Sequence, residues 1–261
     1  MNPVEYEAMA TSEDSHWWYR ALRDALTGVL GQSRFRLRDD MRALDAGCGT
    51  GANLQHLAQL YPAARLSGFD YSELAIQFAR VKVPEADLYL SDLRHPDLRG
   101  DPVDLIVSFD VIAVPGLAAV RPGLERLVGH LRPGGLFIVH VPAYQWLLSD
   151  HDMACHQYER YAPADIRRLL TELGLTVEFL THRVAGPFPL LVATRLPSIL
   201  GHRKAPDTAR SQVRVSSAVV NTVLGGMMRG ENLLIRRGWR MPWGSSLLAV
   251  GRKPTPGPST P

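Results

Sequence analysis

A glycine-rich turn between an apolar strand and a helix constrains this chain more than any other feature. The run LDAGCGTG occupies positions 44–51, and the stretch at 53–61 that follows has helical character. Glycine suits such a turn because a Cβ would block both the sharp bend and the approach of a ligand to the backbone. The strand, turn and helix predict the first unit of an α/β fold, with a ligand at the turn.

Apolar runs and helical stretches alternate along most of the chain. The predicted strands lie at 42–47, 64–70, 86–92, 103–110 and 134–142, and the predicted helices at 53–61, 73–81, 124–131 and 164–173. Such alternation predicts a mostly parallel sheet with helices on both faces. Two further predicted strands, at 174–184 and 245–253, flank a basic insert.

Composition narrows the class of protein. A chain of 261 residues with 46% hydrophobic content is large enough for a globular domain with a sizeable core. The only two cysteines, Cys48 and Cys155, exclude a disulfide framework and a thiolate metal cluster. The first twenty residues lack the pattern of a signal peptide. The longest uncharged run of the insert, 215–228, is shorter than the roughly 17 residues that a spanning helix needs. We therefore predict a cytoplasmic protein.

Three acids end the first three predicted strands. Read loosely, positions 47–52 also fit a dinucleotide-binding turn, but a pyrophosphate disfavours a carboxylate as close as Asp45. Asp70 stands where doubly wound folds place a carboxylate for ribose hydroxyls, and Asp92 is placed to bind the amine of adenine. Together the acids predict a pocket for a positively charged nucleoside such as S-adenosylmethionine.

Five motifs then occur in a familiar order: LDAGCGTG (44–51), GFDYS (68–72), LSDL (90–93), VSFDV (107–111) and LRPGG (131–135). Over roughly 42–184 the chain resembles the class I S-adenosylmethionine-dependent methyltransferases. The resemblance implies a Rossmann-like, seven-stranded, mostly parallel sheet with helices on both faces. The strand at 245–253 would be its last, antiparallel member.

The resemblance also implies which residues bind the cofactor. They are Asp45, Gly47 and Gly49 at its methionine end, Asp70 at the ribose, Tyr71, Asp92 and Leu93 at the adenine, and Phe109 with Asp110 below the sulfonium. One departure from the family matters. Many relatives read Leu-Glu-His-Val shortly after the Phe-Asp-Val of the fourth strand, whereas this chain reads FDVIAVPG and lacks that histidine.

The loop at 141–161 is rich in titratable and aromatic side chains. Histidine accepts a proton near neutral pH, so we predict His156, then His151, as general base, with Asp152 orienting one imidazole. Alternatively, these residues cap the next helix and bind the loop to itself. Their types also suit a metal, but their spacing matches no established pattern, so we predict no metal site. His140 is interpreted as a core histidine with satisfied hydrogen bonds.

The segments outside the core are predicted to cover the site. Residues 1–40 form a helical lid, with Ser15 as a helix N-cap and with Tyr19 and Arg20 over the cofactor, unless the neighbouring tryptophans only anchor the helix to the sheet. The core spans 41–183. The insert at 184–244 carries nine lysines and arginines against two acids, which fits a substrate cap, a dimer contact or an anionic membrane surface. The last strand spans 245–253, and the tail at 254–261 is predicted to be disordered.

These observations predict an S-adenosylmethionine-dependent methyltransferase that acts on a small or lipid-like molecule, at oxygen. Methylation of a protein or RNA is the alternative within the same fold. The chain shows no appended RNA-binding module, its net charge is only +3, and it lacks the Asn/Asp-Pro-Pro-Tyr loop of amino-group methylation, so we expect no nucleic-acid partner. A non-catalytic cofactor-binding scaffold is an alternative of another class. A dinucleotide oxidoreductase is disfavoured by Asp45.

Overall fold

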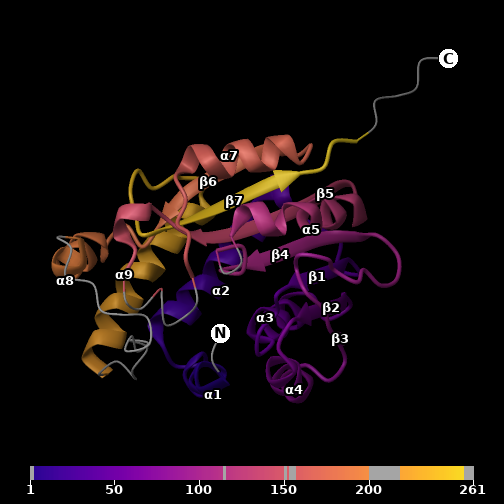
Figure 1. Ribbon diagram of the computed structural model, residues 1–261, viewed down its shortest axis with the longest axis horizontal. Helices are drawn as coiled ribbons and strands as arrows, with labels where there is room; N and C mark the ends of the chain where they lie inside the picture. The colour runs from indigo at the N-terminus through magenta and orange to yellow at the C-terminus, as the bar shows by residue number, and fades with distance from the viewer. Residues whose placement is uncertain (1–2, 114–115, 150–151, 153–156, 200–217, 256–261) are drawn as a thin grey trace.

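A seven-stranded sheet forms the centre of the computed structural model, which describes residues 3–113, 116–149, 152, 157–199 and 218–255 (Figure 1). The strands are β1 (Arg42–Ala46), β2 (Arg65–Asp70), β3 (Asp87–Leu90), β4 (Val103–Phe109), β5 (Leu131–Pro142), β6 (Thr176–Arg183) and β7 (Ser246–Arg252). Their order is β3-β2-β1-β4-β5-β7-β6, and only β7 runs antiparallel to its neighbours. The predicted Rossmann-like fold is confirmed.

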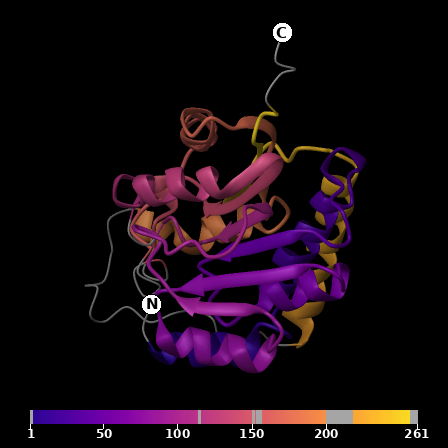
Figure 2. The same cartoon turned by 90° about the vertical axis from the view of Figure 1, so that its right-hand side faces the viewer.

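Helices cover both faces of this sheet. One face carries α5 (Leu117–His130) and α7 (Pro163–Glu172), whereas the other carries α2 (Trp17–Leu30), α3 (Ala52–Leu60), α4 (Glu73–Lys82) and α9 (Ala218–Arg236). Figure 2 shows α2 in indigo and α9 in gold, side by side. The remaining described helices are α1 (Pro3–Ser12), α8 (Phe188–Ile199) and two short 3-10 turns, η1 (Ser33–Phe35) and η2 (Gln145–Leu147).

The position of strand β5 between two layers of helices explains why its sequence is almost continuously apolar. Phe137 and Val139 pack toward α5 and α7, while Leu136 and Ile138 pack toward α2 and α9. A strand between two helical layers buries both of its faces, so it needs apolar side chains at every position. By the same alternation, His140 lies on the α2 face of the sheet.

The start of α2 differs from the sequence prediction. The helix begins at Trp17, and its N-cap is His16, whose Nδ1 accepts a hydrogen bond from Trp18 N. The hydroxyl of Ser15, which was the predicted N-cap, instead donates to the carbonyl of Ser12. An imidazole nitrogen here accepts the capping hydrogen bond, which a hydroxyl or carboxylate oxygen accepts at most helix N-termini.

Part of the insert packs against the N-terminal helix. The Gln32 amide donates to Ile235 O at 2.8 Å, and Asn232 Nδ2 donates to Ala21 O at 3.0 Å. These bonds hold α2 and α9 together as one layer over the sheet. Among the described residues, no helix combines the length and apolar character needed to cross a membrane. Residues 200–217 of the insert and 256–261 of the tail lie outside the described part, and the domain boundaries remain predictions.

The sheet order reverses direction between β1 and β4. Connections from these neighbouring strands leave toward opposite sides, which opens a crevice at their carboxyl ends. The glycine turn follows β1 directly, so this crevice is the expected ligand site.

Candidate active site

The glycine turn adopts backbone conformations that favour glycine. Gly47 and Gly49 have φ values of 85° and 52°, and a Cβ on Gly47 would lie 2.4 Å from Val111 Cγ2. The amides of Gly47 and Cys48 both donate to Phe69 O at 2.9 Å. The turn is thereby fixed to the end of β2, beside Asp70.

The Asp70 carboxylate connects three segments. Its Oδ2 accepts a hydrogen bond from Gly49 N at 3.0 Å, and its Oδ1 accepts from Ser72 N at 3.0 Å and from the Tyr6 hydroxyl at 3.3 Å. Burial raises the pKa of this carboxyl, and the hydrogen bonds from the two amides and from Tyr6 oppose that rise. The structure therefore brings the predicted ribose ligand against the glycine turn.

Asp45 lies fully buried near the end of β1. Neither of its carboxylate oxygens has a hydrogen-bond partner among the described residues. Burial raises the pKa of Asp45 to about 7, and the charge of Asp70 acts in the same direction. The Asn53 side chain opposes the rise. A buried carboxylate without partners is costly, and a cationic ligand would remove that cost.

Helix α1 and the turn after it cover the glycine turn. Besides the contact of Tyr6 with Asp70, the buried Glu13 accepts a hydrogen bond from Thr50 Oγ1 at 2.6 Å and pairs with Lys82. Sequence reasoning missed Tyr6 and Glu13, because both reach the site from segments that carry no recognisable motif. A buried acid near the N-terminus has no local signal in a single sequence.

The three predicted adenine ligands lie on the loops after β2 and β3. Leu93 is buried, whereas Tyr71 is exposed. The Asp92 carboxylate is bound by the Arg94 guanidinium, with Nη2 to Oδ2 at 2.5 Å, and this hydrogen bond lowers the pKa of Asp92. Arg94 therefore competes with any ligand for Asp92.

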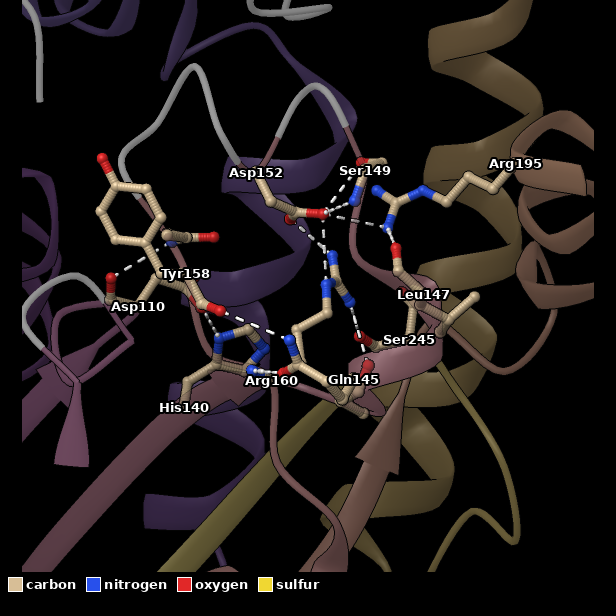
Figure 3. Close-up of polar contacts among 12 residues, drawn as sticks. Asp110, His140, Gln145, Leu147, Ser149, Asp152, Tyr158, Arg160, Arg195 and Ser245 are labelled. Atoms are coloured by element: carbon tan, nitrogen blue, oxygen red, sulfur yellow. Dashed lines mark hydrogen bonds and ion pairs between the residues drawn. The ribbon is translucent and has the colours of Figure 1, made fainter. Parts of the chain in front are cut away.

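Phe109 and Asp110, at the end of β4, contact His140 on β5. The register pairs Phe109 with His140, and Asp110 Oδ1 lies 2.9 Å from His140 Nδ1 (Figure 3). The Trp18 ring of α2 lies edge-on to the imidazole, with centroids 5.8 Å apart. His140 is fully buried as predicted, but its Nε2 has no hydrogen-bond partner within the described chain. The interpretation of a satisfied histidine is therefore wrong for this nitrogen.

The two predicted lid residues lie in the first turn of α2. The Tyr19 ring lies edge-on to His16, with centroids 5.9 Å apart, and Arg20 is exposed. Their contact with the cofactor remains a prediction.

His151 and His156, the predicted general bases, lie outside the described residues. The nearby Asp152 is held by an ion pair with Arg160, at 2.6 Å, and by Ser149 N at 2.7 Å, with Arg195 3.5 Å away (Figure 3). Burial alone would raise the pKa of Asp152, but the two arginines and Ser149 lower it overall. Asp152 thus holds the loop through two arginines, and its orientation of an imidazole remains a prediction. The described residues contain no cluster of three or more ligands suited to a metal.

Comparison with known proteins decides the family. Residues 43–135 match a family model described as a methyltransferase domain. The chain is 32% identical, over 210 residues, to a trans-aconitate 2-methyltransferase of Deinococcus radiodurans, covering 78% of this chain and 74% of that relative. The chain belongs to the S-adenosylmethionine-dependent methyltransferases.

Other relatives of this methyltransferase differ in what their names say they act on. A dTDP-4-amino-2,3,4,6-tetradeoxy-D-glucose N,N-dimethyltransferase of Saccharopolyspora spinosa is 32% identical to this chain over 136 residues, which cover 51% of each protein.

 The match with that protein therefore spans about half of its length and of this chain. A solved complex that contains the Haloferax volcanii Trm112 methyltransferase activator includes a methyltransferase that aligns with 98% of this chain and 95% of its own, at a TM-score of 0.61 and 19% identity. At that identity the likeness shows the fold alone.

The residues of the crevice fit the cofactor of this family. S-adenosylmethionine supplies a methyl group that is already activated by a positively charged sulfonium, and it carries a cationic amino group. The unpartnered, buried carboxylate of Asp45 beside the glycine turn suits such a cation. The Asp70 oxygens are within reach of the same turn and suit hydroxyl donors.

Proposed function

We propose that this methyltransferase transfers a methyl group to an oxygen atom of a small or lipid-like molecule, with Asp45 and Asp70 holding the cofactor. The observation that carries the proposal is the pairing of an unpartnered buried carboxylate with a glycine turn at the crevice between β1 and β4. Tyr71, Asp92, Leu93, Phe109 and Asp110 complete the proposed cofactor site as the family resemblance implies.

Enclosure of the site supports a small acceptor. Phe109 is only 8% exposed and His140 is fully buried, because α2 covers the ends of β4 and β5. Residues so buried suit contact with a compact molecule or a single extended chain better than contact with the surface of a folded macromolecule. The name of the Deinococcus radiodurans relative also indicates a small acid as acceptor.

The outer surface of the insert supports a lipid-like acceptor. Large apolar side chains are exposed there, namely Leu190 on α8, Val219, Val223 and Met227 on α9, and Trp243 after it. Exposed apolar groups close to arginines suit an amphiphilic molecule or the surface of an anionic membrane. The alternative role of this surface is a homodimer contact through α8 and α9.

The acceptor can be identified by incubating the protein with S-adenosylmethionine that carries a deuterated methyl group. The panel contains hydroxy acids, carboxylic acids, phenols, amino sugars and lipids with hydroxyl head groups, and mass spectrometry records both the labelled product and S-adenosylhomocysteine. We expect a labelled ether or ester, and much less label with Asp70→Ala at a cofactor concentration near the wild-type Kd. Label on amines alone would replace oxygen with nitrogen, as the name of the Saccharopolyspora spinosa relative indicates for that protein. Tight cofactor binding without turnover would instead favour a scaffold.

A further inference from the structure

Three buried polar atoms on β5, β6 and β7 lack hydrogen-bond partners in the described part of the chain, besides the Asp45 oxygens on β1 and Asn232 Oδ1 on α9. They are His140 Nε2 on β5, Arg183 Nη1 on β6 and Ser246 Oγ on β7. Each such atom costs about 1–3 kcal/mol when it is left without a partner. Several such atoms on neighbouring strands indicate a polar ligand.

The register of the sheet brings these residues to one face and one edge. Ser246 pairs with Pro142 of β5 and with Arg183 of β6, and directly paired residues share a face. His140 lies two positions before Pro142, so it lies on that face as well. The C-terminal ends of β5 and β6 lie at the same edge of the sheet, because both strands run antiparallel to β7.

Helix α2 covers both His140 and Arg183. Trp18 packs on the His140 ring, and Arg183 Nη2 donates to Ala21 O at 3.1 Å. Positions 18 and 21 are neighbours on one face of a helix, so the two side chains lie under adjacent parts of α2. Burial lowers the pKa of Arg183, and among the charges that oppose this is Asp110, the partner of His140.

The free atoms are chemically complementary. Asp110 accepts the hydrogen bond of His140 Nδ1–H, which leaves a lone pair on Nε2 as an acceptor. Arg183 is held by Glu231 at 2.8 Å and by Ala21, so its Nη1 remains as a donor. One acceptor and one donor, both on the face of the sheet that α2 covers, match a hydroxyl group, which donates one hydrogen bond and accepts another.

We propose that His140 Nε2 and Arg183 Nη1 bind the hydroxyl group of the methyl acceptor, and that His140 receives its proton. The inference rests on the proposed function and makes the acceptor a hydroxyl compound. The oxygen forms its bond to the methyl carbon as the bond from that carbon to sulfur breaks. The electron pair stays on sulfur, giving S-adenosylhomocysteine, and the hydroxyl proton moves to Nε2. Arg183 positions the oxygen, and Asp110 stabilises the imidazolium.

The electrostatic surroundings of His140 are simple within the described residues. Asp110 faces it from the end of β4, Arg183 lies on β6 with Glu231 of α9 behind it, and α2 contributes the uncharged Trp18. Asp110 and Arg183 carry opposite charges on the two sides of the imidazole.

The first test reads the protonation of His140 and needs no acceptor. Two-bond ¹H–¹⁵N correlation spectra of ¹⁵N-histidine-labelled protein are recorded with S-adenosylhomocysteine bound, and His140→Gln assigns the resonance. We expect Nδ1 to carry the proton and Nε2 to show a free lone pair at pH 7.5. A protonated Nε2, or one that is strongly hydrogen-bonded before any acceptor is added, overturns the proposal. Absence of S-adenosylhomocysteine binding is instead a failure of the proposed function.

The second test measures turnover with the hydroxyl compound that the panel identifies. General-base catalysis contributes about 100-fold or more, so His140→Gln should lower kcat by that factor and remove the acidic limb of the pH profile, with cofactor affinity unchanged. In Arg183→Lys, the ammonium group still pairs with Glu231, but it replaces the planar guanidinium that also offers Nη1. This variant should therefore raise the KM for the acceptor about tenfold. An unchanged kcat in His140→Gln, or an acceptor that has no hydroxyl group, overturns the proposal.

His182→Gln is the matched control. His182 is also buried on β6, but its Nδ1 lies 3.1 Å from Met241 O and its Nε2 lies 2.7 Å from the Tyr144 hydroxyl. Both of its ring nitrogens therefore have partners, and it lies on the opposite face of the sheet. Its substitution should leave the pH profile unchanged, and equal changes in both variants would indicate a structural effect.

Discussion

The two halves of the crevice are built in different ways. The donor side takes seven of the predicted cofactor ligands, from Asp45 to Leu93, from the ends of β1, β2 and β3, each next to the strand that positions it. The proposed acceptor side combines Trp18, Asp110, His140 and Arg183, which are distant in sequence and meet only through sheet register and helix packing. Local motifs can therefore identify the donor side, whereas the acceptor side becomes visible only in three dimensions.

Charge separates the two halves as well. On the donor side, Asp45 is buried without a partner, so this side is prepared to receive a cation. On the acceptor side, the buried ions are paired, Asp152 with Arg160 and Glu231 with Arg183. We expect substitutions on the donor side to change cofactor affinity, and substitutions on the acceptor side to change stability or turnover.

The largest expected effect is on the acceptor side, from Asp152→Asn. The side chains of Asp152 and Arg160 are 2% and 5% exposed, so the substitution leaves a buried guanidinium without its countercharge. Breaking such a pair costs about 3–5 kcal/mol of unfolding free energy. The pKa of Asp152 is depressed, so its contribution to stability is present above the ordinary aspartate pKa and is lost as the pH falls below that value. Urea unfolding at pH 7 and pH 3 measures both effects.

Asp97→Asn is the control for that experiment. Its ion pair with Arg99 is exposed on both sides, and exposed pairs contribute about 0–1 kcal/mol. If Asp152→Asn also weakened S-adenosylhomocysteine binding more than about twofold, the two halves would not be independent.

Asp70→Ala should have the next largest effect, on the donor side. Removing the carboxylate that is proposed to bind the ribose hydroxyls loses charged hydrogen bonds of about 1.5–3 kcal/mol each, so the affinity for S-adenosylhomocysteine should fall about 100-fold. Calorimetric titration measures this loss. Asp87→Ala, at an exposed position where β3 begins, is the control and should bind normally. Binding by Asp70→Ala within about threefold of wild type would remove Asp70 from the cofactor site.

Much of the fold was predictable from sequence for a physical reason. The strands of a parallel sheet are buried on both faces, so they stand out as apolar runs, and their carboxyl ends place acids such as Asp45 and Asp70 at one edge. The pairing of Asp92 with Arg94 was not predicted, although the two residues are only two positions apart. A carboxylate at a strand end does not show by itself whether a neighbouring side chain already binds it.

The less predictable features depend on long-range packing. His140 reads as one polar residue inside an apolar strand, and nothing near it in sequence shows that Trp18 covers it or that Asp110 binds only one of its nitrogens. Tyr6 reaches Asp70 across 64 positions. Such contacts follow from where the helices pack, and amphipathic periodicity fixes the buried face of a helix but not its partner.

Asp45→Asn should separate stability from binding on the donor side. The folded-state pKa of Asp45 is raised to about 7, so the fold gains stability from this group at low pH and loses it as the pH rises through 7. The amide cannot ionise, so the variant should be more stable than wild type by about 2 kcal/mol at pH 8, roughly half of what a shift of this size carries, because an amide is also costly to bury. Thermal unfolding of the ligand-free protein at pH 5 and pH 8 measures the difference.

The same variant should bind S-adenosylhomocysteine more weakly, because it cannot offer a negative charge to the amino group of the ligand. In wild type, affinity should rise as Asp45 ionises near pH 7, and this rise should be absent in Asp45→Asn. Equal stability of the two proteins at pH 8, together with parallel pH dependence of binding, would contradict the assignment of Asp45 as the partner of the cation.

The smallest expected effect, from Tyr6→Phe, tests whether α1 belongs to the donor side or only covers it. The Tyr6 hydroxyl is bonded to Asp70 Oδ1 and is buried, so a ribose hydroxyl must displace it to reach that oxygen. Losing this competing bond, which is worth about 1 kcal/mol, should tighten S-adenosylhomocysteine binding about two- to fivefold. Glu7→Gln, at an exposed position on the same helix, should bind as wild type does. Weaker binding by Tyr6→Phe would mean that the hydroxyl itself contacts the cofactor, and the donor side would then also include a segment that no local motif marks.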